Sequence, residues 1–146
     1  MLFDRFLKRR RAATAVPPAS QESLRELACG HADPSVRLDA VRRLADLSYL
    51  RDLLAADGDA PVRELALARY RHLLAGSEDV GLALEQRLAE VALVQDLRVI
   101  EPLAREGREP ELRRAALDRV QSQELLADCA VQDPVAANRG LAIARV

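Results

Sequence analysis

The sequence of 146 residues predicts an all-α fold, an α-solenoid of about five 26-residue units that each contain two helices. The first observation is composition: hydrophobic residues make up 49% of the chain, yet it has two Phe, two Tyr and no Trp. A core built from Leu, Ala and Val suits closely packed helices, because Ala and Leu are strong helix formers. Second, no segment shows the alternating β-branched pattern of a strand. Third, one arginine recurs at a nearly fixed interval, which predicts a repeated unit.

The recurring arginine belongs to several columns that repeat together. Its copies are separated by 26, 26, 24, 26 and 26 residues, at Arg11, Arg37, Arg63, Arg87, Arg113 and Arg139. Three residues after it most units have an alanine, with Glu90 as the exception, and an aliphatic residue follows directly. Seven residues after it lie Leu44, Tyr70, Val94, Val120 and Val146. Joint recurrence of these columns predicts a repeated helical unit rather than a chance spacing of arginines.

Turn residues mark the helix boundaries along the chain. An acidic residue and a proline precede each regular arginine helix, at Asp33-Pro34, Asp59-Ala60-Pro61, Glu109-Pro110 and Asp133-Pro134. Proline is tolerated at the first helical position because its missing N–H would have no partner there. Nine residues after the arginine, Ser or Asp in four of five units predicts the N-cap of a second helix, and His72 holds that position in the fifth. Helices of about ten residues are unstable alone, so stacking of units must stabilise them.

The unit that begins at Arg63 departs from the pattern. It is two residues short, and it reads "AGSEDVG" where the others continue into a second helix. We therefore expect a loop or a malformed helix at residues 75–81, within an irregular unit near residues 75–86.

Two stretches, "LRVIEPLAREGREPELRRAALDRV" and "DPSVRLDAVRRLADLSYLRDLLAADGDAPVR", resemble HEAT-like (armadillo-type) helical repeats, especially the short bacterial type. The resemblance covers residues 20–146 and is poorest at residues 75–86. It implies that an Asp in the inter-helix turn and an Arg near the start of the second helix form ladders from repeat to repeat. The opening "MLFDRFLKRRR" followed by such units also resembles the N-terminus of large bacterial proteins of unknown function that begin with this array.

The position of the recurring arginine predicts a structural role. On a helical wheel Arg37 falls inside the apolar arc, and a buried charge persists only when it is paired and hydrogen-bonded. Carboxylates in the nearby turns are the obvious partners. The predicted arginine ladder comprises Arg37, Arg63, Arg87, Arg113 and Arg139 with Asp33, Asp59 and Glu109. The alternative is a row of anion receptors, which we disfavour because acid and arginine recur together.

A second arginine column lies six residues after the first, at the edge of the apolar stripe. It contains Arg43, Arg69, Arg119 and Arg145, with Leu93 as the exception. Such a row could contact the phosphates of a nucleic acid or an acidic peptide. The alternative is a solvated helix face with local pairs, such as Arg43 with Asp39, and the acidic charge of the repeats favours it.

Residues 1–19 form a basic amphipathic segment and a linker. Residues 1–11 carry five basic side chains and one acidic one, a net charge of +4, against −5 for the rest. Lys8, Arg9, Arg10 and Arg11 are further candidate contacts to a partner or to phosphate, and the segment could also dock on a membrane surface. The alternative, which we favour for the two Phe residues, is a cap that covers the first repeat.

Other signals exclude several functional classes. Cys29 and Cys129 give no disulfide framework and suggest a reducing compartment, and no stretch is long enough to cross a bilayer, so we expect a cytoplasmic protein. Cys29 and His31 lack a second pair of metal ligands, and no phosphate-binding glycine loop or nucleophile elbow occurs. We therefore assign no catalytic, cofactor-binding or metal-binding residue, and we expect no enzyme activity.

The sequence stops eight residues into an arginine helix, at "NRGLAIARV", which predicts an open apolar edge. Either the natural chain continues or that edge binds another chain, and we expect self-association or instability there. Taken together, these patterns predict a non-catalytic scaffold for protein–protein interaction. The alternative is a nucleic-acid-binding module that uses the second arginine column and the basic N-terminus.

Overall fold

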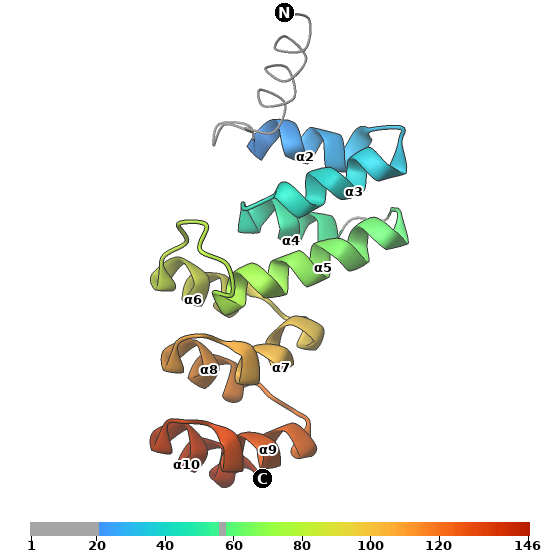
Figure 1. The fold of residues 1–146 in the computed structure, drawn as a ribbon. Coiled ribbons are helices and arrows are strands. Elements are labelled where there is room, and N and C mark those ends of the chain that lie inside the picture. The colour runs from blue at the N-terminus through green and yellow to red at the C-terminus, as the bar shows by residue number, and fades with distance from the viewer. Residues whose placement is uncertain (1–20, 56–57) are drawn as a thin grey trace, which may run out of the picture.

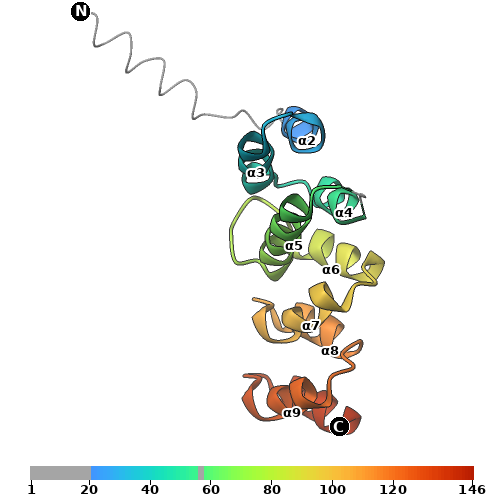
Figure 2. The same cartoon turned by 90° about the vertical axis from the view of Figure 1, so that its right-hand side faces the viewer.

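The computed structural model describes residues 21–55 and 58–146. Within these residues every regular element is an α-helix, so the all-α prediction is confirmed for this part of the chain. The helices follow one another along one long axis, with α2 near one end and α10 at the other (Figure 1). The view turned by 90° shows the same progression from α2 to α9 (Figure 2). Residues 1–19, with the candidates Lys8, Arg9, Arg10 and Arg11, lie outside the described residues.

Most of the helices form antiparallel pairs of sequence neighbours. Their bounds are α2 (Gln21–Gly30), α3 (Pro34–Arg43), α4 (Leu47–Ala55), α5 (Ala60–Ala75), α6 (Leu84–Leu93), α7 (Leu97–Glu106), α8 (Pro110–Leu117), α9 (Gln123–Gln132) and α10 (Ala136–Arg145). The pairs are α2 with α3, α4 with α5, α7 with α8, and α9 with α10. In each pair the second helix carries the recurring arginine. α6 also carries one, Arg87, but a loop precedes it instead of a short helix.

The acidic residue before each proline caps a helix at some of the predicted positions and not at others. Asp33 is the N-cap of α3 and its carboxylate accepts a hydrogen bond from the Ser35 N–H, with Pro34 at the first helical position. Asp59 and Glu109 occupy the N-cap positions of α5 and α8, but their carboxylates make no capping bond. Asp133 does not begin a helix: α10 starts at residue 136, and Asp133 instead accepts from the Val135 N–H at 2.9 Å.

The irregular unit combines a long helix with a loop. α5 has 16 residues, and His72, which the sequence placed at an N-cap, lies inside it. The helix ends at Ala75, and its C-cap is Gly76, whose φ of 78° is left-handed. Residues 76–83 form the loop that the sequence placed at 75–81. A Cβ at Gly76 would lie 2.5 Å from Nη1 of Arg87. Glycine is therefore required here for its backbone conformation and for the close approach of α6.

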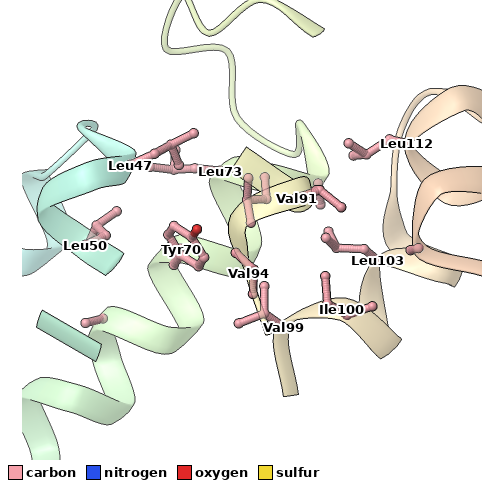
Figure 3. Packing of buried hydrophobic residues seen from close by; sticks show 14 of the residues in the cluster. Leu47, Leu50, Tyr70, Leu73, Val91, Val94, Val99, Ile100, Leu103 and Leu112 are labelled. Atoms are coloured by element: carbon pink, nitrogen blue, oxygen red, sulfur yellow. The ribbon is translucent and has the colours of Figure 1, made fainter. Parts of the chain in front are cut away.

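The core is a continuous strip of aliphatic side chains between the helices. Leu50, Leu73, Ile100 and Leu103 are almost fully buried, and Tyr70 is the one aromatic residue among the buried core residues described. Figure 3 shows Tyr70 between the α4 residues and Val91 and Val94 of α6. None of the helices in residues 21–55 and 58–146 is both long enough and apolar enough to cross a membrane.

Candidate interaction site at the irregular unit

Three members of the predicted arginine ladder contact a carboxylate of the following turn. Arg37 donates to Asp59 at 2.8 Å, Arg87 forms two bonds with Glu109 at 2.8 and 2.6 Å, and Arg113 donates through Nε to Asp133 at 3.0 Å. The partner of Arg113 was not among the acids that the sequence assigned to the ladder. Asp33 was assigned to the ladder, but among the described residues it forms no ion pair with a ladder arginine. It caps α3 instead.

The same guanidinium groups also bond to backbone carbonyls of the preceding turn. Arg37 donates to the His31 carbonyl at 2.6 Å and Arg113 to the Gly107 carbonyl at 2.9 Å. Arg139 donates to the backbone carbonyl of Asp133 at 2.7 Å. Each of these arginines therefore satisfies acceptors at the turn before its helix, and Arg37 and Arg113 cross-link that turn to the next. This explains how an arginine is tolerated in the apolar stripe.

The ladder carboxylates stay ionised because of these contacts. The hydrogen bonds from Arg87 lower the pKa of Glu109 below its ordinary value. Burial by itself would raise the pKa of Asp133, but the hydrogen bonds from Arg113 and the Val135 N–H outweigh it, and the pKa falls. These are the charge-assisted bonds expected of an ionised pair.

The ladder is interrupted at Arg63. Its guanidinium donates to the carbonyl of Gly58, as the other ladder arginines do to their own turns. Among the described residues, however, no carboxylate lies within ion-pair distance of it. The interruption falls where no short helix precedes α6.

Most side chains of the second arginine column bind backbone carbonyls within the molecule and do not form a free row of charges. Arg69 donates to the Leu44 carbonyl at 2.9 Å, Arg119 to the carbonyls of Val91 (2.5 Å) and Val94, and Arg145 to that of Leu117. These acceptors lie at the C-terminal ends of α3, α6 and α8, where helix carbonyls lack intrahelical partners. Arg43 instead pairs with Asp39 at 3.4 Å, the local pair that the sequence suggested. All four candidate side chains are thus engaged within the molecule, three of them with backbone carbonyls.

A polar network lies in the core beside the loop. The hydroxyl of Tyr70 and Nη1 of Arg51 both donate to Oε1 of Glu90, each at 2.6 Å. Burial, and then the hydrogen bond to Glu90, raise the pKa of the Tyr70 phenol above its ordinary value. Glu90 replaces the usual alanine of its column, and Tyr70 replaces a Leu or Val. The sequence marked Glu90 as an exception without giving it a role; its coincidence with the irregular unit was the available signal.

This network joins two helices that are not neighbours along the chain. Arg51 lies on α4 and Glu90 on α6, 39 residues later. On α4, Leu47, Arg51 and Leu54 follow one another at intervals of four and three residues, so they share one helix face. Because no short helix precedes α6, α4 can reach α6 directly through Arg51.

Cavities lie at both ends of this face of α4. One, of about 420 Å³, is lined by Leu47 and Ser48 of α4, Val80 and Leu82 of the loop, and Gln86 and Glu90 of α6, among others. The other, of about 150 Å³, is lined by Leu54, Ala60, Arg63, Glu64, Leu67 and Arg98. We call the face that carries Leu47, Ser48, Arg51 and Leu54, together with these two cavities, the α4 surface.

The C-terminal edge differs from its prediction in one respect. α10 packs against α9, so the last arginine helix does have a helix partner, because every described arginine helix except α6 pairs with the helix before it. Ile143 and Val146 are 62% and 65% exposed, whereas Leu141 packs partly against the core. Self-association through this edge stays a prediction.

The chemistry of the described residues offers little else. No cluster of three or more His, Cys, Asp or Glu side chains suited to a metal ion occurs in residues 21–55 and 58–146. Burial raises the pKa of the Cys129 thiol, so it stays protonated and unreactive at neutral pH. Compared with protein-family models, curated proteins and solved structures, the chain gives no match to any of them.

Proposed function

We propose that the chain is a non-catalytic scaffold of HEAT-like repeats, stacked as an α-solenoid, that binds a protein partner along the α4 surface. The observation that carries this proposal is the missing short helix between α5 and α6, which leaves the partly exposed face of α4 covered only by the loop of residues 76–83. Elsewhere a short helix stands between consecutive arginine helices, whereas between α5 and α6 there is only the loop of residues 76–83. A segment of another protein can occupy the space beside α4 that such a helix would fill.

The repeated contacts between units support a solenoid. The carboxylate partners lie 22 residues after Arg37 and Arg87 and 20 residues after Arg113. The carbonyls bound by Arg69, Arg119 and Arg145 lie 25 or 28 residues before them. Contacts of similar sequence separation, each joining one unit only to its neighbour, are typical of a repeat array.

The composition of the α4 surface favours a protein over a nucleic acid. Its larger cavity is lined by apolar side chains, amides and the carboxylate of Glu90, and a carboxylate repels a phosphate backbone. The candidate phosphate contacts Arg69, Arg119 and Arg145 are engaged with carbonyls. Nucleic-acid binding would then depend on Arg43 and on the basic residues 8–11. It is our second candidate function because of the positive charge of residues 8–11.

A photo-crosslinker tests the proposed function. Benzoylphenylalanine would replace Gln86, which lines the larger cavity, and in a control chain it would replace Glu111, an exposed residue of α8. We expect a protein adduct from an extract of the source cells that forms at position 86 and not at 111. The captured protein should then bind the purified chain, lose binding to a Leu82→Glu variant, and retain binding to a Glu111→Lys variant.

Circular dichroism must show that both variants keep the helical content of the parent chain. Identical adducts at both positions, or a captured species that binds the Leu82→Glu variant as well as the parent, would contradict a partner site on the α4 surface.

A further inference from the structure

We infer that Arg63 and Arg98 form a receptor for a carboxylate supplied by an acidic side chain of the protein partner. The inference rests on the proposed function, because it names the chemistry that the partner presents to the smaller cavity of the α4 surface. The incoming carboxylate takes the place of the ladder acid that no described residue brings to Arg63.

Internal comparison of the repeats is the first support. Arg37, Arg87 and Arg113 each bind a carboxylate. Arg37 and Arg113 also bind a backbone carbonyl in the turn before their own helix. Arg63 keeps the carbonyl contact, to Gly58, but has no carboxylate among the described residues. Its side chain is only partly exposed, so solvent compensates its charge incompletely. A guanidinium has five donors, and the bond to the Gly58 carbonyl leaves most of those of Arg63 available.

The missing acid has a physical cause in the fold. The residue 22 positions after Arg63, where Arg37 and Arg87 find their partners, is Glu85. Glu85 lies in the first turn of α6, beyond the loop of residues 76–83, and it is exposed and forms no recorded ion pair. Because the unit lacks its short helix, the chain does not return an acidic turn to the end of α5 that carries Arg63.

Arg98 supplies a second guanidinium from a different helix. It lies in the first turn of α7 and pairs with Asp96 at 2.7 Å, and its side chain is 71% exposed. Asp96 also caps α7 through the Arg98 N–H, so the pair is anchored to a helix end. Arg63 and Arg98 thus line one cavity from α5 and α7.

The rest of the lining suits a protein side chain. Leu54, Ala60 and Leu67 provide apolar walls against which the methylene groups of a glutamate can pack, and the cavity of about 150 Å³ is small. Glu64 also lines it but forms an ion pair with neither arginine. Arg98 holds Asp96 through Nε and Nη2, so its Nη1 and the guanidinium of Arg63 are left to face an incoming acid. All the observed ladder partners are carboxylates, which favours an acidic residue over a phosphate.

The test uses the full chain and small probes, so that it does not depend on identifying the partner. The Nε–H signals of Arg63, Arg98 and Arg114 would be followed by ¹⁵N NMR during titration with N-acetyl-glutamate. N-acetyl-glutamine is the neutral control, and Arg114, an exposed residue of α8 outside the cavity, is the internal reference.

We expect saturable shifts of Arg63 and Arg98, at least about fivefold weaker binding of the neutral probe, and loss of the saturable Arg98 shift in an Arg63→Gln variant. Small linear shifts that are the same at Arg114 would overturn the inference, as would unchanged binding in Arg63→Gln. A third titration with dimethyl phosphate distinguishes the ligand class: tighter binding than N-acetyl-glutamate would also overturn it, in favour of a nucleic acid. If the probes fail while the crosslink at position 86 succeeds, only this inference falls and the scaffold stands.

Discussion

At the scale of single residues, Arg87 shows what allows a charge to lie in an apolar stripe. The residue is only 6% exposed, and both oxygens of Glu109 accept from its guanidinium. Removing one partner of such a pair leaves an uncompensated buried charge, which costs more than the pair itself contributes. The pair therefore affects stability mainly because its loss would leave the buried Arg87 charge without a partner.

The variant Glu109→Gln tests this pair. It keeps the size of the side chain but removes the negative charge, so we expect the free energy of unfolding to fall by about 2 kcal/mol. Urea denaturation followed by circular dichroism measures the change. Glu111→Gln, on the exposed side of the same helix, is the control and should stay within about 0.5 kcal/mol of the parent chain. Equal effects of both substitutions would show that the pair is not a structural contact.

The variant Gly76→Ala tests the close approach of α5 and α6. A Cβ would meet the Arg87 guanidinium, and the φ of 78° is unfavourable for alanine, so we expect a loss of at least about 1–2 kcal/mol. Gly30→Ala is the matched control, since its Cβ would meet nothing within 4 Å and its φ is not left-handed. Thermal unfolding should separate the two variants; a Gly76→Ala chain as stable as Gly30→Ala would contradict the packing described.

The sequence predicts the ladder arginines better than the second arginine column for a physical reason. A guanidinium and a carboxylate that recur at fixed spacing are both visible as residue types, so the pairings of Arg37 with Asp59 and of Arg87 with Glu109 can be anticipated. The acceptors of Arg69 and Arg119 are backbone carbonyls at helix ends, which every residue has. No pattern of side chains identifies them, so these two arginines looked free.

At the scale of elements, the contrast between α5 and the loop that follows explains the irregular unit. The segment "AGSEDVG" correctly predicted a break, because it lacks the aliphatic spacing of a helix. It did not predict that α5 would continue to residue 75. Tyr70, Leu73 and Leu74 extend the buried stripe at helical intervals, and His72 is a poor N-cap, so nothing stops the helix before Gly76. The position of His72 in the N-cap column of the repeat was misleading, because the apolar residues around it continue the helical spacing of α5.

The element with the least support from its sequence neighbours is α6, and Arg119 tests how it is held. Arg119 bonds to two carbonyls at the C-terminal end of α6. We expect Arg119→Gln to increase amide hydrogen exchange in residues 84–94 at least several-fold, because the end of the helix frays without its cap. Arg43→Gln, which removes a local surface pair, is the control and should leave exchange in α6 unchanged. Exchange that rises equally in all helices would instead indicate a global loss of stability.

At the scale of the whole molecule, the two arginine columns act as ties between consecutive units. The first column ties turns together through carboxylates, and the second ties the ends of helices to the next unit through carbonyls. Each tie joins neighbouring helix pairs only, so under the solenoid that we propose we expect stability to depend mainly on the interfaces between neighbouring units. The space beside α4 is where this series of ties is interrupted.

The response to acid follows from the pKa shifts of the ladder. The pKa values of Glu109 and Asp133 are lowered in the folded state, so both carboxylates stabilise the fold at pH values above their unfolded pKa. That contribution is lost as the pH falls through the folded pKa values. We expect the free energy of unfolding to fall on acidification from pH 6 to pH 3 as these two carboxylates become protonated. Urea titrations at several pH values measure it.

The Glu109→Gln chain is the control for the acid response. It should lose part of this pH dependence while remaining less stable than the parent at pH 6. An unchanged slope would mean that Glu109 titrates alike in the folded and unfolded chains.

The hydrogen bond between Tyr70 and Glu90 has an optical consequence. The chain has no Trp and two Tyr, so its near-ultraviolet absorption comes mainly from two phenol rings, one of them enclosed beside the loop of residues 76–83. Burial and the hydrogen bond to Glu90 raise the pKa of that phenol, so we expect the ring to ionise in alkali only after the surrounding helices separate. The appearance of its phenolate band, followed over time after a jump in pH, would thus act as a clock for the opening of this one region, without any added label.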